Sequence, residues 1–357
     1  MRLPSIAAGI ITLALAACPV ISNVATRAVA APAAGPQEAG PGPMLPPGAK
    51  PQQPAPAAPQ NPQNLPQVAQ PLQVRTNVVN VFVTVRDHHN EIVTGLGKSD
   101  FKVFEDGVEQ KVAYFDKEMN LPLTLALLMD TSGSMSNTLV EEQDAASRFV
   151  REVIRKRDEA LVMSFNLDVN LLADFTEDPN VLENAIRRTR INAAGPVITA
   201  GTVPQNGVIG TDLYDAIYLA CSDELSSQAG RKAIIVLTDA EDNGSKETID
   251  DAIEAAQKAD TVIHVILIID PSATTGVGPG VAHEMAEETG GRVIRVHNND
   301  SLEKAFDTIS EELRSQYVLG YYPTNTRRDG TYRKIKVEVD QPGDRILARK
   351  GYFAPYQ

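Results

Sequence analysis

Between Leu121 and about Glu312, the sequence alternates continuous apolar runs with amphipathic segments, and this alternation constrains the fold more than any other feature. The apolar runs are "LTLALLMD", "EALVMSFN", "KAIIVLTD", "TVIHVILIID" and "RVIRVHN". Strands of this kind are buried on both faces, as in parallel sheets covered by helices. The pattern therefore predicts an α/β fold, a doubly wound, mainly parallel sheet with helices on both faces.

The amphipathic segments carry helix signals. Val140 to Arg155 places Ala146, Phe149, Val150 and Val153 on one face, which predicts a helix packed on the sheet. Asp178 followed by Pro179 predicts the start of a second helix. A third helix is predicted from Ser301 onward, with Asp300 and Glu303 in the form of a capping box.

Two flanking segments, residues 73–118 and 316–357, instead alternate apolar and polar residues at period two, which predicts antiparallel strands. Neither flank is long enough to bury a stable core alone. We therefore predict one β-sandwich built from both flanks, with the α/β domain of residues 119–315 inserted between its strands. Two hairpins docked separately on the α/β domain are the alternative. Sandwich packing is also the preferred interpretation of four aromatic residues: Tyr321, Tyr322, Tyr332 and Tyr352.

The first thirty residues read as an export signal. Arg2 precedes an apolar run, Ile6 to Ala17, which is too short to span a bilayer. Two cleavage sites compete: the small residues Ala28 to Ala30 fit a signal peptidase, whereas "LAAC" resembles a lipoprotein box with Cys18 as the lipidated residue. Either predicts an exported protein of the periplasm, the cell surface or the medium. Only the lipoprotein alternative would attach it to a membrane, through a lipid anchor at Cys18.

Composition indicates which classes of partner, linker and covalent cross-link to expect. Residues 31–72 are rich in Pro, Ala, Gln and Gly, which predicts a disordered linker. The chain has 33 basic and 46 acidic residues, a net charge of −13, so nucleic acid is not an expected partner. Cys221 lies on the apolar side of a helical segment and is interpreted as a buried small hydrophobe, and no disulfide framework is expected.

Polar side chains follow three of the predicted elements. Asp130, Ser132 and Ser134 come directly after one strand, Thr211 opens a helix, and Asp239 ends another strand. Loops that leave the carboxyl ends of parallel strands meet at one edge of the sheet, where ligands bind. Hydroxyl and carboxylate oxygens without nitrogen or sulfur donors favour a hard cation, so we predict Mg²⁺ or Mn²⁺ at this edge.

"DTSGSM", a later Thr before "LYDAI", and a later "LTD" together resemble the metal-ion-dependent adhesion site (MIDAS) of von Willebrand factor type A domains. The resemblance covers about Leu121 to Arg314. The flanks "DFKVFEDGVEQKVAYF" and "QYVLGYYPTN" resemble those of an exported bacterial family first noted among acidobacteria. The resemblance implies a doubly wound α/β fold. It also implies that Ser132, Ser134 and Thr211 are direct ligands, and that Asp130 and Asp239 act largely through waters.

The resemblance further implies a function. Neutral hydroxyl ligands leave the ion electrophilic, and an Asp or Glu carboxylate of a partner protein would fill its open position, so we expect a metal-dependent protein-binding module of the cell envelope rather than an enzyme. A metal-assisted hydrolase and a structural scaffold stiffened by the metal are the alternatives. The residues themselves offer no histidine base or histidine metal spacing for catalysis.

Two features depart from the family pattern. Ala240 stands where the family usually has glycine, and the loop of residues 191–210 is long, which suits either a specificity loop or a tolerated insertion. Nearby acidic residues are interpreted as solvated loop charges: Asp212, Asp242 and Asp270. The sequence does not indicate an oligomeric state.

Overall fold

The computed structural model describes residues 78–117, 122–191, 210–269, 278–341 and 343–356. The predicted export signal and linker, most of the 191–210 loop and Asp270 lie outside these residues. Within the described ranges, the helices are too short or too polar to span a bilayer.

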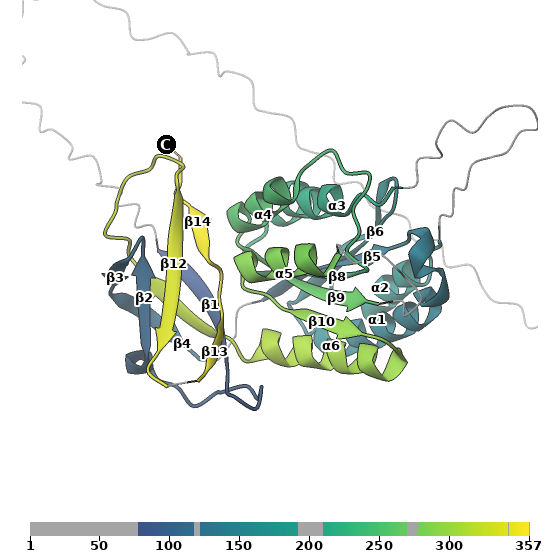
Figure 1. Ribbon diagram of the computed structural model, residues 1–357. Coiled ribbons are helices and arrows are strands. Elements are labelled where there is room, and N and C mark those ends of the chain that lie inside the picture. Colours follow the sequence, from purple (N-terminus) through teal and green to yellow (C-terminus); the bar gives the residue numbers. More distant parts are fainter. Residues whose placement is uncertain (1–77, 118–121, 192–209, 270–277, 342, 357) are drawn as a thin grey trace, which may run out of the picture. The chain divides into compact units, whose positions relative to one another are not determined.

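The α/β part is built around a central sheet (Figure 1). Among the described residues its strands are β5 (Leu123–Asp130), β6 (Glu159–Phe165), β7 (Val169–Thr176), β8 (Arg231–Thr238), β9 (Thr261–Ile268) and β10 (Val293–Val296). Their order is β10-β9-β8-β5-β6-β7. All neighbouring pairs are parallel except β6 and β7, which pair antiparallel at one edge. The predicted doubly wound, mainly parallel sheet is confirmed.

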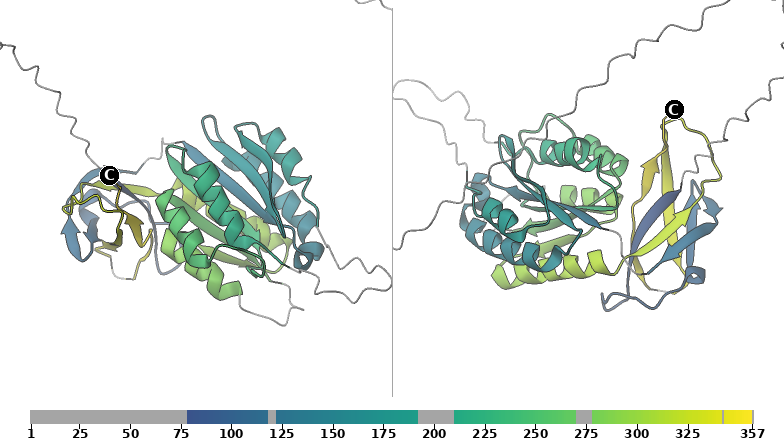
Figure 2. Two further views of the ribbon diagram at one scale, coloured as in Figure 1. Left: turned by 90° about the horizontal axis from the view of Figure 1, so that it is seen from above. Right: turned by 180° about the vertical axis from the view of Figure 1, so that it is seen from behind.

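Helices cover both faces of this sheet (Figure 2). One face carries α1 (Leu139–Val153), α2 (Pro179–Ile186) and α6 (Asn299–Arg314). The other carries α3 (Leu213–Leu219), the π-helical turn η3 (Ala220–Leu225), α4 (Ile249–Lys258) and α5 (Gly278–Thr289). The short 3₁₀ turn η2 (Gly133–Asn137) joins β5 to α1.

Strand β5 shows why the apolar runs are continuous. All of its residues are buried, and successive side chains enter opposite cores. Leu125 and Leu127 pack under α1, α2 and α6, whereas Ala126 and Leu128 pack under α3, α4 and α5. Cys221 is fully buried in the second of these cores, and burial raises the pKa of its thiol.

The flanks form two further antiparallel sheets. Their elements are β1 (Val79–Arg86), the 3₁₀ turn η1 (Lys98–Asp100), β2 (Phe101–Glu105), β3 (Val108–Gln110), β4 (Val112–Asp116), β11 (Tyr317–Tyr321), β12 (Tyr332–Val339), β13 (Arg345–Leu347) and β14 (Gly351–Phe353). The strand orders are β13-β1-β11-β4 and β14-β12-β2-β3, so each sheet combines strands from both ends of the chain. The prediction that strands from both flanks pair with one another is therefore confirmed, and the alternative of two separately docked hairpins is excluded.

The core between these two sheets includes polar groups that contact one another. Tyr321 and Tyr352 are buried there, and their hydroxyls donate to the buried Glu105 carboxylate at 2.8 and 2.9 Å. Arg333 forms an ion pair with the same carboxylate. Tyr322, in contrast, is 41% exposed, so the sandwich buries two of the four tyrosines singled out by sequence.

Helix starts follow the predicted chemistry in one case and depart from it in another. Asp178 caps α2 by accepting a hydrogen bond from the Asn180 backbone N–H, with Pro179 as the first helical residue. Helix α6 begins at Asn299 rather than Ser301, because Asn298 accepts from the Ser301 backbone N–H. The predicted Asp300 and Glu303 capping box is therefore wrong.

His264 lies in β9 with its side chain 2% exposed, and burial followed by the charge of Arg292 lowers its pKa to about 3. A lowered folded-state pKa gives stability that is complete above the unfolded value near 6.5 and is lost as the pH falls toward 3. Between pH 6 and pH 4, we expect the free energy of unfolding to fall more steeply for the unmodified chain than for His264→Leu, by about 1.4 kcal/mol per pH unit at most.

Urea unfolding at several pH values would measure this difference. The matched control is His283→Leu, which replaces an exposed histidine of α5 and should keep the steep dependence. Parallel pH profiles for the unmodified chain and His264→Leu would contradict the expectation.

Candidate metal centre

The loops that carry the predicted ligands lie at the carboxyl end of the central sheet. Strand β5 ends at Asp130, its parallel neighbour β8 ends at Thr238, and Asp239 follows immediately. The chain leaves β5 toward α1 on one face and leaves β8 toward α4 on the other. The two strands thus flank the point where the winding of the sheet reverses, which is where open α/β sheets bind ligands.

Asp130 holds the first two loops together. It is fully buried, and its Oδ1 accepts a hydrogen bond from the Ser132 backbone N–H at 2.8 Å. Its Oδ2 accepts from the Thr238 hydroxyl at 2.6 Å, and that hydroxyl in turn accepts from the Ala240 backbone N–H at 2.9 Å. One carboxylate therefore orients both the serine turn after β5 and the turn that carries Asp239.

The two serine hydroxyls lie side by side. Ser132 Oγ and Ser134 Oγ are 2.9 Å apart, and the Met135 backbone N–H donates to the Ser132 carbonyl to close the turn. Ser132 is buried and Ser134 is exposed. This close pair of neutral oxygens is therefore accessible to solvent on the Ser134 side.

Asp239 lies in a left-handed turn. Its Oδ1 accepts from the Glu241 backbone N–H at 3.1 Å, and the following Ala240 has φ +59°. Glycine adopts this conformation without strain, which explains the glycine of the family pattern, whereas alanine costs about 1 to 2 kcal/mol. Ala240 nevertheless adopts the left-handed conformation that this turn requires. Gly278 packs against this turn so closely that a Cβ there would lie 2.2 Å from the Asp239 carbonyl oxygen.

Thr211 belongs to a third loop that is bonded to the second. Its carbonyl accepts from the backbone N–H groups of Asn243 and Gly244 at 3.2 and 3.3 Å. The next residue, Asp212, donates its backbone N–H to the carbonyl of Asn166, just after β6, at 2.6 Å. The structure thus places all five predicted residues at the same edge of the sheet, and their role as ligands stays a prediction.

The site gathers buried carboxyl groups, which carry negative charge when they are ionised. Burial raises the pKa of Asp130 to about 6, with Asp239 adding to the rise and the hydrogen bonds from Ser132 and Thr238 opposing it. Burial also raises the pKa of Glu142, in α1, to about 8, against the hydrogen bond from Thr138. The charged groups that act most strongly on the pKa values of Asp130 and Glu142 are all acidic. A divalent cation would offset this charge, so the residues fit such an ion.

The donor chemistry also points to a hard cation. Among the described residues, no cluster of three or more His, Cys, Asp or Glu side chains is arranged to hold a metal. The five predicted residues offer hydroxyl and carboxylate oxygens, and hard divalent cations prefer oxygen donors of this kind.

The other acids at this edge have different roles. Asp242 Oδ2 accepts from the Tyr214 backbone N–H at 3.1 Å and from the Ser245 hydroxyl at 2.6 Å, so it orders the start of α3. Burial, with the nearby charge of Asp215, raises the pKa of Asp212 to about 6. Asp242 is therefore held by hydrogen bonds rather than being a freely solvated charge.

Sequence reasoning missed Thr238 and Glu142. Glu142 lies four residues before Ala146, on the face of α1 that packs against the sheet, and a charged residue at such a position is the signal that could have identified it. Thr238 is the threonine of "LTD", and in the sequence it is indistinguishable from an ordinary strand residue.

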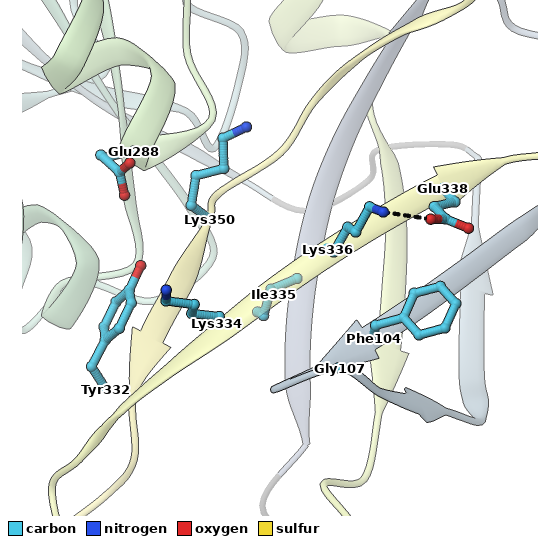
Figure 3. Close-up of a pocket in the computed structure, with 9 residues that line it drawn as sticks. All are labelled: Phe104, Gly107, Glu288, Tyr332, Lys334, Ile335, Lys336, Glu338 and Lys350. Atoms are coloured by element: carbon cyan, nitrogen blue, oxygen red, sulfur yellow. Dashed lines mark ion pairs between the residues drawn. The ribbon is translucent and has the colours of Figure 1, made fainter.

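A pocket of about 530 Å³ lies elsewhere, on the strands of the sandwich (Figure 3). Lys334, Lys336 and Lys350 line it, and Lys336 pairs with Glu338 at 2.7 Å. It contains none of the five predicted residues, so it is separate from the metal centre.

In a comparison with protein families, residues 125–242 match the von Willebrand factor type A domain. This range includes all five predicted site residues. Comparison with curated proteins gave no match.

The solved structures that are similar to this chain include three proteins, each with low sequence identity to it. BatB from Bacteroides thetaiotaomicron is 19% identical, over 54% of this chain and 100% of BatB, with a TM-score of 0.42. The von Willebrand factor domain of the type V pilus tip protein Mfa5 from Porphyromonas gingivalis is 14% identical, over 54% and 95%, with a TM-score of 0.41. Proximal thread matrix protein 1 from the mussel byssus, with a zinc-occupied MIDAS motif, is 14% identical, over 56% and 49%, with a TM-score of 0.42. The chain thus spans about half of the mussel protein.

Proposed function

We propose, from the premise that this chain carries a von Willebrand factor type A domain, that it binds a partner protein through a divalent cation, Mg²⁺ or Mn²⁺. Domains of this type often mediate protein–protein interactions. The residues that would hold the ion are Asp130, Ser132, Ser134, Thr211 and Asp239. The observation that carries the proposal is the hydrogen bond from Thr238 to Asp130, which joins the two strand ends that bear most of these oxygens.

The chain's own residues suit a bridging role. The hydroxyl oxygens of Ser132 and Ser134 are neutral and adjacent, while the Asp130 carboxylate is buried behind them and already accepts two hydrogen bonds. When bound, the ion supplies an electrophilic centre for an Asp or Glu carboxylate of the partner. The exposed Ser134 leaves that side of the turn accessible to a second protein.

We further propose that the chain acts outside the cytoplasm, as an adhesion or assembly module of the cell envelope. The support is the sequence of its first thirty residues, with Arg2 ahead of the apolar run from Ile6 to Ala17. A proline-rich linker would then separate the folded part from an anchor at Cys18, if the lipoprotein box is used.

The test is capture of partners from an envelope extract by the immobilised full chain, with Mg²⁺ and with a chelator. We expect capture with Mg²⁺, none with the chelator, and none with Asp239→Ala. The matched control is Asp250→Ala, which removes an exposed carboxylate from the first turn of α4 and should leave capture unchanged. Amidation of carboxyl groups in the extract should abolish capture as well, because the partner contributes an Asp or Glu.

Two other outcomes would replace the proposal. Capture that persists in the chelator, together with a lower melting temperature without Mg²⁺, would show a scaffold that the metal only stabilises. Metal-dependent hydrolysis of an extract component, lost in Asp239→Ala, would show an enzyme.

A further inference from the structure

Glu142 is a buried carboxylate that the predicted ion site does not use. It lies in the first turn of α1 and is 0% exposed, whereas its neighbour Glu141 is exposed. Glutamate is almost never fully buried unless it is paired. Its position therefore requires a physical reason.

One of its oxygens is bound to the turn that carries the serines. The Thr138 hydroxyl donates to Glu142 Oε1 at 2.6 Å, and the Glu142 backbone N–H donates to the Thr138 carbonyl at 2.9 Å. Thr138 also donates its backbone N–H to the Met135 carbonyl at 3.1 Å. Met135 follows Ser134 in η2, so Glu142 supports the serine turn through one intermediate residue.

The other oxygen has no such contact. Glu142 Oε2 is buried and finds no hydrogen-bond partner among the residues that the structure describes. The acidic groups that act on Glu142 are Asp130, Asp239 and the exposed Glu141. Two of these belong to the predicted ion site, so Glu142 lies within electrostatic reach of that site.

A buried carboxylate with an unsatisfied oxygen is unfavourable unless a positive charge or a donor completes it. We propose that Glu142 is a sixth residue of the ion site, a positioning residue that supports the Ser134 turn through Thr138. It also supplies a further buried negative charge, which a bound divalent cation offsets. This inference rests on the proposed ion site and adds to it a residue on a different element.

The competing explanation is purely structural: Glu142 would be a protonated acid that packs α1 against the sheet. Replacement by glutamine separates the two explanations, because it keeps the shape and the acceptor for Thr138 but removes the charge. A structural acid would tolerate glutamine in both stability and metal affinity. A residue of the ion site would lose metal affinity.

The experiment is calorimetric titration of the full chain with MgCl₂, for the unmodified protein, Glu142→Gln and the control Glu141→Gln. Replacement of a group that lies behind the direct ligands of a metal site typically lowers metal affinity about 10- to 100-fold. Because Glu142→Gln keeps the acceptor for Thr138 and removes only the charge, we expect its loss at the lower end of this range, about 10-fold. Glu141→Gln removes the same charge from the exposed position of the same turn and should bind Mg²⁺ within about twofold of the unmodified chain, as expected for a screened surface charge.

Affinity of Glu142→Gln within about threefold of the unmodified chain, well short of the usual loss, would overturn the inference and leave the ion site standing. Absence of Mg²⁺ binding by the unmodified chain would overturn both. Unfolding in chelator checks that the variant is folded. If it is not, Thr138→Val replaces it: this variant keeps the carboxylate but removes its donor, and an unchanged Mg²⁺ affinity would then count against the inference.

Discussion

Asp130→Asn is expected to lose Mg²⁺ binding by at least about 100-fold, beyond the loss typical of residues that only orient metal ligands. The variant removes the one carboxylate that accepts hydrogen bonds from both the Ser132 N–H and the Thr238 hydroxyl. Asparagine can still accept from Ser132 and can donate to Thr238, so the two loops keep their connection. What disappears is the buried negative charge that a cation requires.

Without metal, the same variant should be at least as stable as the unmodified chain. Burial raises the pKa of Asp130 to about 6, so its ionised form is disfavoured in the folded protein. A raised folded-state pKa gives stability that is complete below the unfolded value and is lost as the pH rises through about 6. At pH 7 in chelator the ionised Asp130 therefore destabilises the fold, and neutral asparagine does not.

Calorimetric titration with MgCl₂ and urea unfolding in chelator measure the two effects together. The matched control is Asp168→Asn, which removes an exposed carboxylate from the β6–β7 connection at the same edge of the sheet. It should bind Mg²⁺ almost normally. If Asp130→Asn binds Mg²⁺ as the unmodified chain does, or if Asp168→Asn loses binding equally, the ion is not held where we place it.

The sequence was most informative where one physical requirement acts over many residues. Continuous burial of "LTLALLMD" on both faces is possible only between two layers of helices, and period-two alternation in the flanks requires a half-covered antiparallel sheet. Strand β1 pairs with β11, so that Val81 lies opposite Leu319. That strands from the two flanks would pair was predicted from the short length of each flank, not from any pattern within it.

It was less informative where single residues compete for one role. Asn298, Asp300 and Ser301 all suit a helix start, and only the path of the chain after β10 selects Asn298 as the cap of α6. Similarly, the position of Asp130, Ser132 and Ser134 directly after a predicted strand identifies them as candidates for the site. Glu142 lies inside a helix and has no such signal. Its contact with Thr138, four residues earlier, follows from helix spacing once the start of α1 is known, but its full burial depends on how α1 packs on the sheet.

The largest expected effect on stability comes from Glu312→Ala. Glu312 lies in α6 with its side chain 1% exposed. The Arg86 Nε–H donates to its Oε1 at 2.8 Å, and the Arg292 Nε lies 2.6 Å from the same oxygen. Both arginine side chains are largely buried, at 4% and 18% exposure. Alanine would leave two guanidinium groups close together without the carboxylate that compensates them.

Removing one partner from a buried ion pair typically costs about 3 to 5 kcal/mol, because the remaining charge stays buried and uncompensated. We expect a loss of this size in the free energy of unfolding, measured with urea at pH 7 in chelator, so that metal binding does not contribute. Glu311→Ala, at the adjacent exposed position of α6, should change stability by no more than about 0.5 kcal/mol. A loss below about 1 kcal/mol for Glu312→Ala would mean that water reaches the two arginines and that this network contributes little to the fold.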